Sequence, residues 1–115
     1  MSTDRKIRIR RLNDRLRTAP SVVSALFGRT LVSHGIASLD LSDQVAIMDK
    51  VRTFDTFTPD NDPHGEHDFG AIQHEGLKVL WKIDYYTPDL DGGSADPSDP
   101  LQTCRVLTVM LAEEY

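Results

Sequence analysis

Two runs of alternating apolar and polar residues, joined by Glu75 and Gly76, restrict the fold of this chain more than any other feature. Residues 69–74 and 77–86 carry the period-two pattern of strands that bury one face. Gly76 provides the glycine that a tight hairpin connection requires. The sequence therefore predicts a β-hairpin, with Trp81 among its buried side chains.

Two further strands are expected, one on each side of this hairpin in the sequence. Residues 103–111 carry apolar side chains on both faces, which predicts a strand at the centre of a sheet. Cys104 in this strand is expected to be a buried, unreactive thiol. A short β-branched stretch at 29–34, between Gly28 and Gly35, is also typical of a strand.

The first helix is expected over residues 4–18 and is strongly basic. Ile9, Leu12 and Leu16 recur at spacings of three and four, which places them on one face of a helix. Residues 1–18 contain seven basic and two acidic side chains and carry a net charge of +5, while the whole chain carries −5. The rest of the chain therefore carries −10, and such a division of charge bears on the choice of partners.

The second helix is expected over residues 43–54. Ser42 is a suitable N-cap, and Asp43 in the first turn suits the positive end of the helix dipole. Lys50 and Arg52 lie near the other end, where the dipole favours cations. Apolar residues recur at helical spacing between Asp43 and Arg52, so residues 43–54 form the most strongly indicated helix.

These elements predict one α+β domain. Their order is helix, strand, helix and three strands, which indicates an antiparallel sheet of about four strands, with a C-terminal meander and two helices packed on one face. A chain of 115 residues can bury one core, so residues 1–115 are expected to form a single domain. No apolar run reaches the roughly 20 residues of a membrane helix, and no signal-peptide segment is found, so we expect a cytoplasmic protein without membrane contact.

The most unusual segment is the loop expected over residues 58–68, which is rich in aspartate and histidine. Its spacing at first resembles a calcium loop, but His64 stands at the fifth position and Ala71 at the twelfth, where a bidentate glutamate is required. Three interpretations remain open: these side chains cap a tight turn, hold a transition metal, or perform acid-base chemistry without a metal. The candidate metal ligands are His64, Glu66, His67 and Asp68.

A second polar loop is expected over residues 87–101, with four aspartates and three prolines. Tyr85 and Tyr86 end the strand before it, where large aromatic side chains can anchor a protein interface. We therefore expect an acidic and aromatic partner-binding surface. Its residues are Asp60, Asp62, Glu66, Asp68, Tyr85, Tyr86, Asp89, Asp91, Asp96 and Asp99.

Three stretches of the chain form long and specific motifs. They are residues 54–70, which contain Phe-Thr-Pro-Asp-Asn-Asp-Pro-His-Gly-Glu-His-Asp-Phe-Gly, residues 81–86 and residues 105–115. These motifs resemble a family of small bacterial proteins described only as a domain of unknown function. The resemblance extends from about residue 8 to the end of the chain. It implies an association with proteobacteria and with plasmid or phage-derived regions, and it supplies no catalytic residues.

The sequence contains no glycine-rich phosphate loop and no Gly-x-Ser-x-Gly elbow, so we expect neither an enzyme nor a cofactor. We expect instead a mobile-element product that inhibits a host nucleic-acid-targeting defence complex of the CRISPR or restriction type. Its acidic loops would occlude a basic surface of that protein or ribonucleoprotein complex. Two alternatives remain: a metal-dependent hydrolase centred on the loop at 58–68, and a nucleic-acid binder that uses the basic helix at 4–18.

Overall fold

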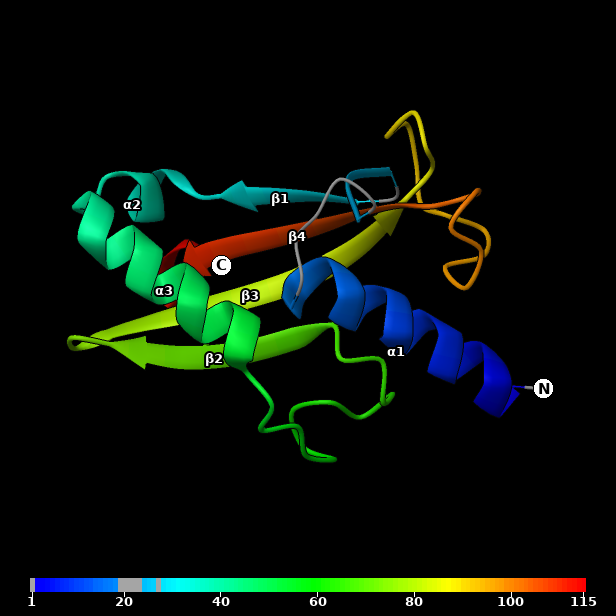
Figure 1. The fold of residues 1–115 in the computed structure, drawn as a ribbon, viewed down its shortest axis with the longest axis horizontal. Helices are drawn as coiled ribbons and strands as arrows, with labels where there is room; N and C mark the ends of the chain where they lie inside the picture. The colour runs from blue at the N-terminus through cyan, green and yellow to red at the C-terminus, as the bar shows by residue number, and fades with distance from the viewer. Residues whose placement is uncertain (1, 19–23, 27) are drawn as a thin grey trace.

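The computed structural model describes residues 2–18, 24–26 and 28–115. In chain order the elements are α1 (Ser2–Thr18), η1 (Ser24–Leu26), β1 (Gly28–Val32), α2 (His34–Ala37), α3 (Leu41–Thr53), β2 (Phe69–His74), β3 (Leu77–Tyr86), β4 (Cys104–Leu111) and η2 (Ala112–Glu114) (Figure 1). The α+β class and the four strands agree with the sequence-based prediction. The hairpin at 69–86 is present with the predicted boundaries.

The four strands form one mixed sheet in the order β1-β4-β3-β2. β2, β3 and β4 make the expected antiparallel meander, and β4 is one of the two central strands. β1 pairs with β4 in parallel, from Gly28 opposite Arg105 to Val32 opposite Val109, so the expectation of a wholly antiparallel sheet is wrong at this edge. The parallel pairing arises because α2 and α3 carry the chain from the end of β1 to the far edge, where the meander begins (Figure 1).

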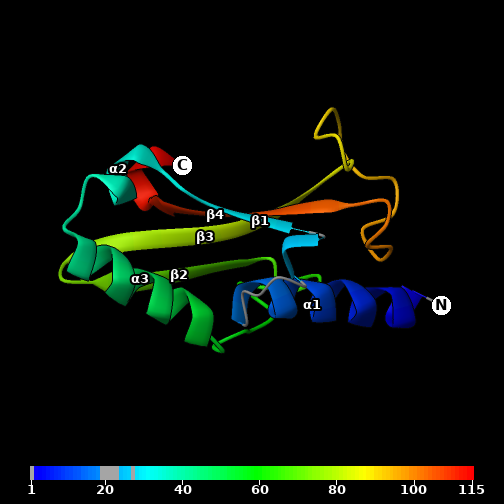
Figure 2. The ribbon, with the colours of Figure 1, turned by 45° about the horizontal axis from the view of Figure 1, so that its top comes forward.

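α1 and α3 lie on the same face of the sheet and contact each other, as the sequence predicts for its two helices (Figure 2). α3 begins at Leu41 with Asp40 as its N-cap, so the expected N-cap Ser42 lies inside the helix. None of the helices in the described residues is long and apolar enough to cross a membrane.

α2 is a third, short helix that the sequence did not predict. The strand expected over 29–34 ends at Val32, because the Ser33 side chain accepts a hydrogen bond from the backbone N–H of Ile36 at 3.3 Å and so caps α2. Ile36 is fully buried. The short helix therefore turns the chain from β1 toward α3 and adds one side chain to the core.

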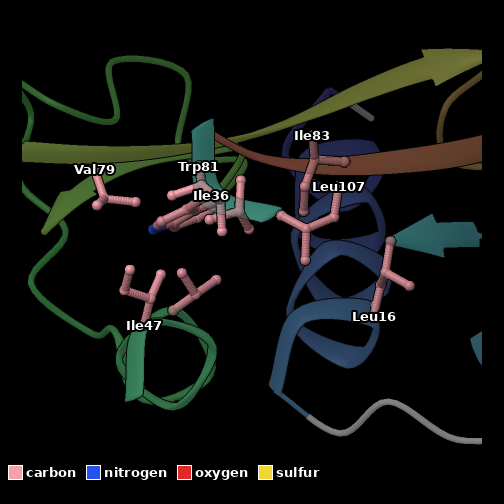
Figure 3. Close-up of a cluster of buried hydrophobic side chains, with 9 residues drawn as sticks. Leu16, Ile36, Ile47, Val79, Trp81, Ile83 and Leu107 are labelled. Atoms are coloured by element: carbon pink, nitrogen blue, oxygen red, sulfur yellow. The ribbon is translucent and has the colours of Figure 1, made fainter. Parts of the chain in front are cut away.

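Trp81 of β3 lies in the middle of the core, between the sheet and α3 (Figure 3). Ile47 packs against it from α3, and Leu107 and Leu16 extend the cluster toward α1 (Figure 3). Trp81 is buried as predicted, and so is Cys104 at the start of β4. The core thus joins both helices to the sheet.

Gly70 of β2 leaves the space that the Trp81 ring occupies. The two residues are opposite each other in the β2–β3 pairing. A Cβ added at Gly70 would lie 2.6 Å from Cε2 of Trp81. The Trp81 position therefore requires glycine in the neighbouring strand.

Gly70→Ala is expected to lower the free energy of unfolding by about 1–3 kcal/mol, because the added methyl overpacks the core beside Trp81. Urea unfolding measures this change. Gly92→Ala is the matched control, since an added Cβ there meets no atom within 4 Å. Equal stability of the two variants would contradict this account of the core.

Candidate nucleic-acid interface

The side of α1 that faces the sheet combines apolar and polar residues. Ile9 and Leu16 are buried, as their helical spacing predicts. Asn13 and Arg17 are buried as well, with 0% and 3% of their surface exposed. Neither polar residue was predicted to be buried, although positions 9, 13, 16 and 17 share one helical face and this spacing indicates it.

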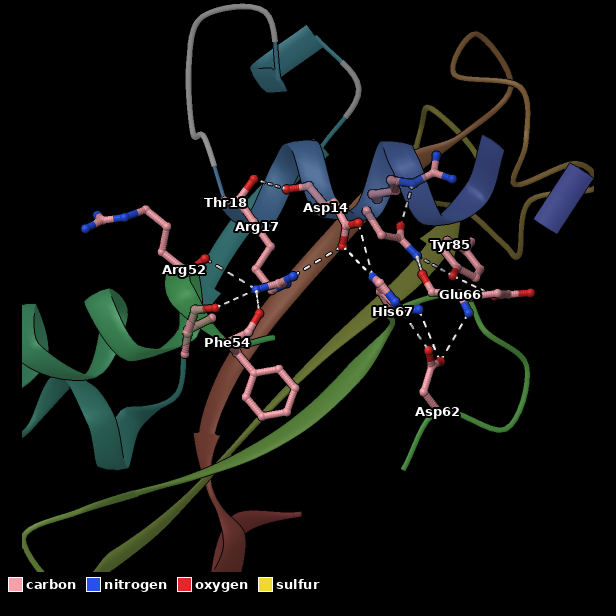
Figure 4. Close-up of polar contacts among 12 residues, drawn as sticks. Asp14, Arg17, Thr18, Arg52, Phe54, Asp62, Glu66, His67 and Tyr85 are labelled. Atoms are coloured by element: carbon pink, nitrogen blue, oxygen red, sulfur yellow. Dashed lines mark hydrogen bonds and ion pairs between the residues drawn. The ribbon is translucent and has the colours of Figure 1, made fainter. Parts of the chain in front are cut away.

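Asn13 links a buried arginine of β4 to a carboxylate in the loop before β2. Arg105, which is fully buried, donates from Nε to Oδ1 of Asn13 at 2.8 Å. Nδ2 of Asn13 donates to Oη of Tyr85 at 2.8 Å and to the backbone oxygen of Glu66 at 3.0 Å. Oη of Tyr85 donates to Oε1 of Glu66 at 2.8 Å (Figure 4). We call this series of bonds, from a cation through two neutral side chains to a carboxylate, the Arg105–Glu66 chain.

Burial affects the protonation of both Arg105 and Tyr85. It lowers the pKa of Arg105 to about 10, so the guanidinium remains charged at neutral pH. Burial also raises the pKa of Tyr85, so its hydroxyl keeps the proton that it donates to Glu66. The guanidinium further donates to the carbonyl of Pro97 and lies 5.2 Å from the centre of the Tyr85 ring. The positive charge is therefore held by neutral neighbours, and Glu66 balances it from the end of the Arg105–Glu66 chain.

Arg17 fixes the end of α1 to the end of α3. Nη1 of Arg17 donates to the backbone oxygens of Val51 and Phe54, both at 2.9 Å, at the C-terminal end of α3, where the helix dipole places partial negative charge (Figure 4). Nη2 donates to Oδ1 of Asp14 at 3.2 Å. The guanidinium carbon lies 4.9 Å from the centre of the Trp81 ring. Arg17 is thus a structural cation, and it does not contribute to the exposed basic surface of α1.

Asp14 also holds the loop before β2, through His67. Nδ1 of His67 lies 2.9 Å from Oδ1 of Asp14, and the imidazole stacks on Phe57 with ring centres 3.7 Å apart. Oδ1 of Asp62 accepts hydrogen bonds from the backbone N–H groups of Glu66 and His67, both at 3.1 Å (Figure 4). Asp62 therefore caps a turn, which is one of the three interpretations that the sequence left open.

The four candidate metal ligands in the loop at 58–68 do not converge on one point. His64 is exposed and Asp68 is half-buried. Glu66 and His67 are bonded to other side chains, as described above. In the described part of the chain, one group of three metal-capable side chains has ligand atoms within 4.8 Å of one another, and this group lies outside the loop at 58–68.

That group is Asp43, His74 and Glu75, between α3 and the β2–β3 hairpin. Nε2 of His74 lies 3.0 Å from Oδ1 of Asp43 and 3.8 Å from Oε2 of Glu75, and Nδ1 lies 3.1 Å from Nζ of Lys50. An ammonium group can only donate, so Nδ1 accepts and Nε2 carries the proton that it donates to Asp43. A metal would need that nitrogen without its proton, so the arrangement fits a tie between α3 and β2 better than a metal centre.

The acidic and aromatic residues expected at a partner surface differ in exposure. Those that lie partly or fully inside the protein are Asp62, Glu66, Asp68, Tyr85 and Tyr86. Those that are exposed are Asp60, Asp89 and Asp91. Asp96 and Asp99 are half-buried and accept hydrogen bonds from backbone N–H groups within the loop at 87–101. The acidic surface is therefore smaller than the sequence predicted, and it is concentrated in that second loop.

The opposite side of α1 carries exposed arginines. Arg8, Arg11 and Arg15 recur at spacings of three and four, and all three are exposed. Within the described residues, no carboxylate oxygen lies within 4.0 Å of their side-chain nitrogens, whereas Nε of Arg5 lies 3.2 Å from Oδ1 of Asp96. We call Arg8, Arg11 and Arg15 the arginine ridge. The buried contacts on the other side of α1 hold this ridge at the surface.

Asp68→Asn is expected to stabilise the protein at neutral pH. Burial and the negative charges of Glu66 and Asp62 raise the pKa of Asp68, so folding disfavours its ionised form. The gain is expected above the raised pKa, fades as the pH falls through it, and vanishes below the unfolded value of roughly 3.9. Urea unfolding across this pH range measures it. Asp91→Asn at an exposed position is the control, and the same pH profile for both variants would exclude this explanation.

Comparison with known proteins identifies the family but no function. Residues 32–114 match the family model described as a protein of unknown function, DUF3768. The match begins at residue 32, at the end of β1, whereas the resemblance was expected from about residue 8. α1 and its arginine ridge therefore lie outside the matched residues. No curated protein and no solved structure matches the chain. Because the match covers most of its length, the chain belongs to the DUF3768 family.

Proposed function

We propose that this protein binds the phosphate backbone of a nucleic acid through the arginine ridge of α1, and that it acts as a binding protein and not as an enzyme. One observation carries the proposal. α1 buries Asn13 and Arg17 on one side and exposes Arg8, Arg11 and Arg15 on the other. The helix therefore exposes three guanidinium groups that form no ion pair with a carboxylate of the described residues.

The arginine ridge suits phosphate in its chemistry and its rigidity. A guanidinium group matches the oxygens of a phosphate with two parallel N–H donors, and its charge does not depend on pH in the physiological range. Arg8 and Arg15 are seven residues apart, which spans about 10 Å along a helix. Because α1 is already fixed to the sheet, binding orders only the arginine side chains and not the helix.

The division of charge favours one orientation of the protein on a nucleic acid. Residues 1–18 carry +5 and the rest of the chain carries −10, so phosphate attracts α1 and repels the remainder. Charges more than about 8–10 Å away are largely screened at physiological ionic strength, so the repulsion is limited to acidic groups near α1. We expect contact along one helix face, with strong dependence on salt and little dependence on base sequence.

Arg11→Gln/Arg15→Gln is expected to weaken DNA binding and to reduce its dependence on salt. The slope of log K against log salt concentration is negative, and loss of two phosphate contacts reduces its magnitude by about 1.8 for duplex DNA. Fluorescence anisotropy of a labelled duplex, titrated at several salt concentrations, measures both effects.

The matched control for this measurement is Arg29→Gln/Lys78→Gln, which removes the same charge from exposed positions in β1 and β3. It is expected to bind almost as the parent protein does. An equal loss in both double variants, or no salt-sensitive binding by the parent protein, would refute the proposal.

A second candidate is the inhibitor of a nucleic-acid-targeting defence complex that the sequence suggested. Its support is the exposure of Asp89 and Asp91 in the loop at 87–101, where they can face a basic partner surface. Asp89→Asn/Asp91→Asn separates the two candidates, because it would weaken binding to such a complex and leave the DNA affinity of the arginine ridge undiminished.

A further inference from the structure

A cavity of about 520 Å³ lies at the end of the sheet where β1 and β4 begin. Gly28 of β1 and Cys104 of β4 line it, together with residues of η1 and of the loop at 87–101, which lie at the same end of the sheet (Figure 1). Its volume is within the range of roughly 300–1,000 Å³ that small-molecule sites have in proteins. We call this space the β1 cavity.

The lining of the β1 cavity is mainly apolar, and part of it is exposed. Leu16 of α1 and Cys104 are buried residues of the lining. Leu26 of η1 and Leu101 of the loop at 87–101 also line the cavity, and they are 81% and 87% exposed. The two most exposed leucines among the described residues therefore border one cavity, and a molecule bound there would remove both from water.

Arg29 of β1 is the charged residue of this lining, and no aspartate or glutamate of the described residues accompanies it. The Arg29 side chain is exposed, and no carboxylate oxygen in the described part of the chain lies within 4.0 Å of its side-chain nitrogens. The loop at 87–101 contributes proline and leucine to the cavity but none of its four aspartates. The β1 cavity therefore combines apolar walls with one positive charge, in a chain whose net charge is −5.

We propose that the β1 cavity binds a small apolar molecule that carries one carboxylate group. The guanidinium of Arg29 matches a carboxylate with two parallel N–H donors, and the apolar part of the molecule lies against Leu16, Leu26 and Leu101. A neutral molecule makes the apolar contacts without the ion pair, and a cation is repelled by Arg29. Mainly apolar walls with a few polar groups that fix the orientation are usual in small-molecule sites.

The β1 cavity is separate from the proposed nucleic-acid interface. Arg8, Arg11 and Arg15 do not line it, and Leu16 belongs to the buried side of α1. Arg29→Gln is part of the double variant that is expected to bind DNA almost as the parent protein does. Loss of carboxylate binding and loss of DNA binding are therefore distinguishable results.

Octanoate, octanol and octylammonium test the class of ligand, because they share one apolar chain and differ in charge. Octanoate is expected to shift the backbone amide NMR signals of Thr30, Leu101 and Cys104, which line the cavity, and to bind more tightly than octanol. Octylammonium is expected to leave these signals in place. The amides of Ala71 and Gln73, on the other edge strand of the sheet, are the internal control. Absence of octanoate shifts at the cavity, or equal affinity for all three molecules, would overturn the proposal.

Arg29→Gln is expected to weaken octanoate binding by about tenfold or more and to leave octanol binding unchanged, because it removes only the charged hydrogen bonds. Lys78→Gln is the matched control, since it removes the same charge from an exposed position on β3 that does not line the cavity. NMR titration of each variant measures the affinities. An equal loss in both variants would show that Arg29 does not hold the carboxylate and would overturn the proposal.

Leu101→Asn is expected to weaken the binding of both octanoate and octanol, because it removes apolar surface from the side of the cavity. Leu90→Asn changes another exposed leucine of the same loop, outside the cavity lining, and is expected to bind both molecules as the parent protein does. The same titration compares the two variants. Parent-like affinity of Leu101→Asn for octanoate would contradict the assigned position of the apolar chain.

Discussion

The structure depends on the hydrogen-bond chain that leads from the buried Arg105 to Glu66. A buried guanidinium group is costly unless its charge and its donors are satisfied. In Arg105, Nε and Nη2 have hydrogen-bond partners, whereas Nη1 has none among the described residues. Here the charge on β4 is met by Asn13 from α1, by the ring and hydroxyl of Tyr85 from β3, and finally by Glu66 from the loop before β2. Four separate segments of the chain must therefore be in place before Arg105 can be buried.

This requirement determines which side of α1 is exposed. An apolar stripe alone tolerates some rotation of a helix, whereas the bonds of Asn13 and Arg17 fit one orientation only. The opposite side then carries the arginine ridge to the surface. The buried polar contacts thus connect the stability of the fold with its proposed binding of phosphate, since the same helix supplies both.

The sequence predicted the elements of this fold better than their polar connections. Period-two and helical patterns located the hairpin at 69–86, the central β4 and both long helices, because apolar periodicity follows directly from burial. The parallel pairing of β1 was not predictable from the sequence, since it depends on the edge of the sheet at which β2 begins after α3. Asn13 and Arg17 were missed because polar residues are usually exposed, and the acidic loop was overestimated because the sequence does not show that Asp62 and Glu66 bond within the chain.

A double-mutant cycle between Asn13→Ala and Tyr85→Phe tests the role of the Arg105–Glu66 chain most directly. Urea unfolding of the parent, the two single variants and the double variant gives the coupling free energy. If the two side chains act as links of one chain, the double variant loses less stability than the sum of the singles, by about 1 kcal/mol or more. Losses that add to within about 0.3–0.5 kcal/mol would show that the bonds are independent and would contradict the account.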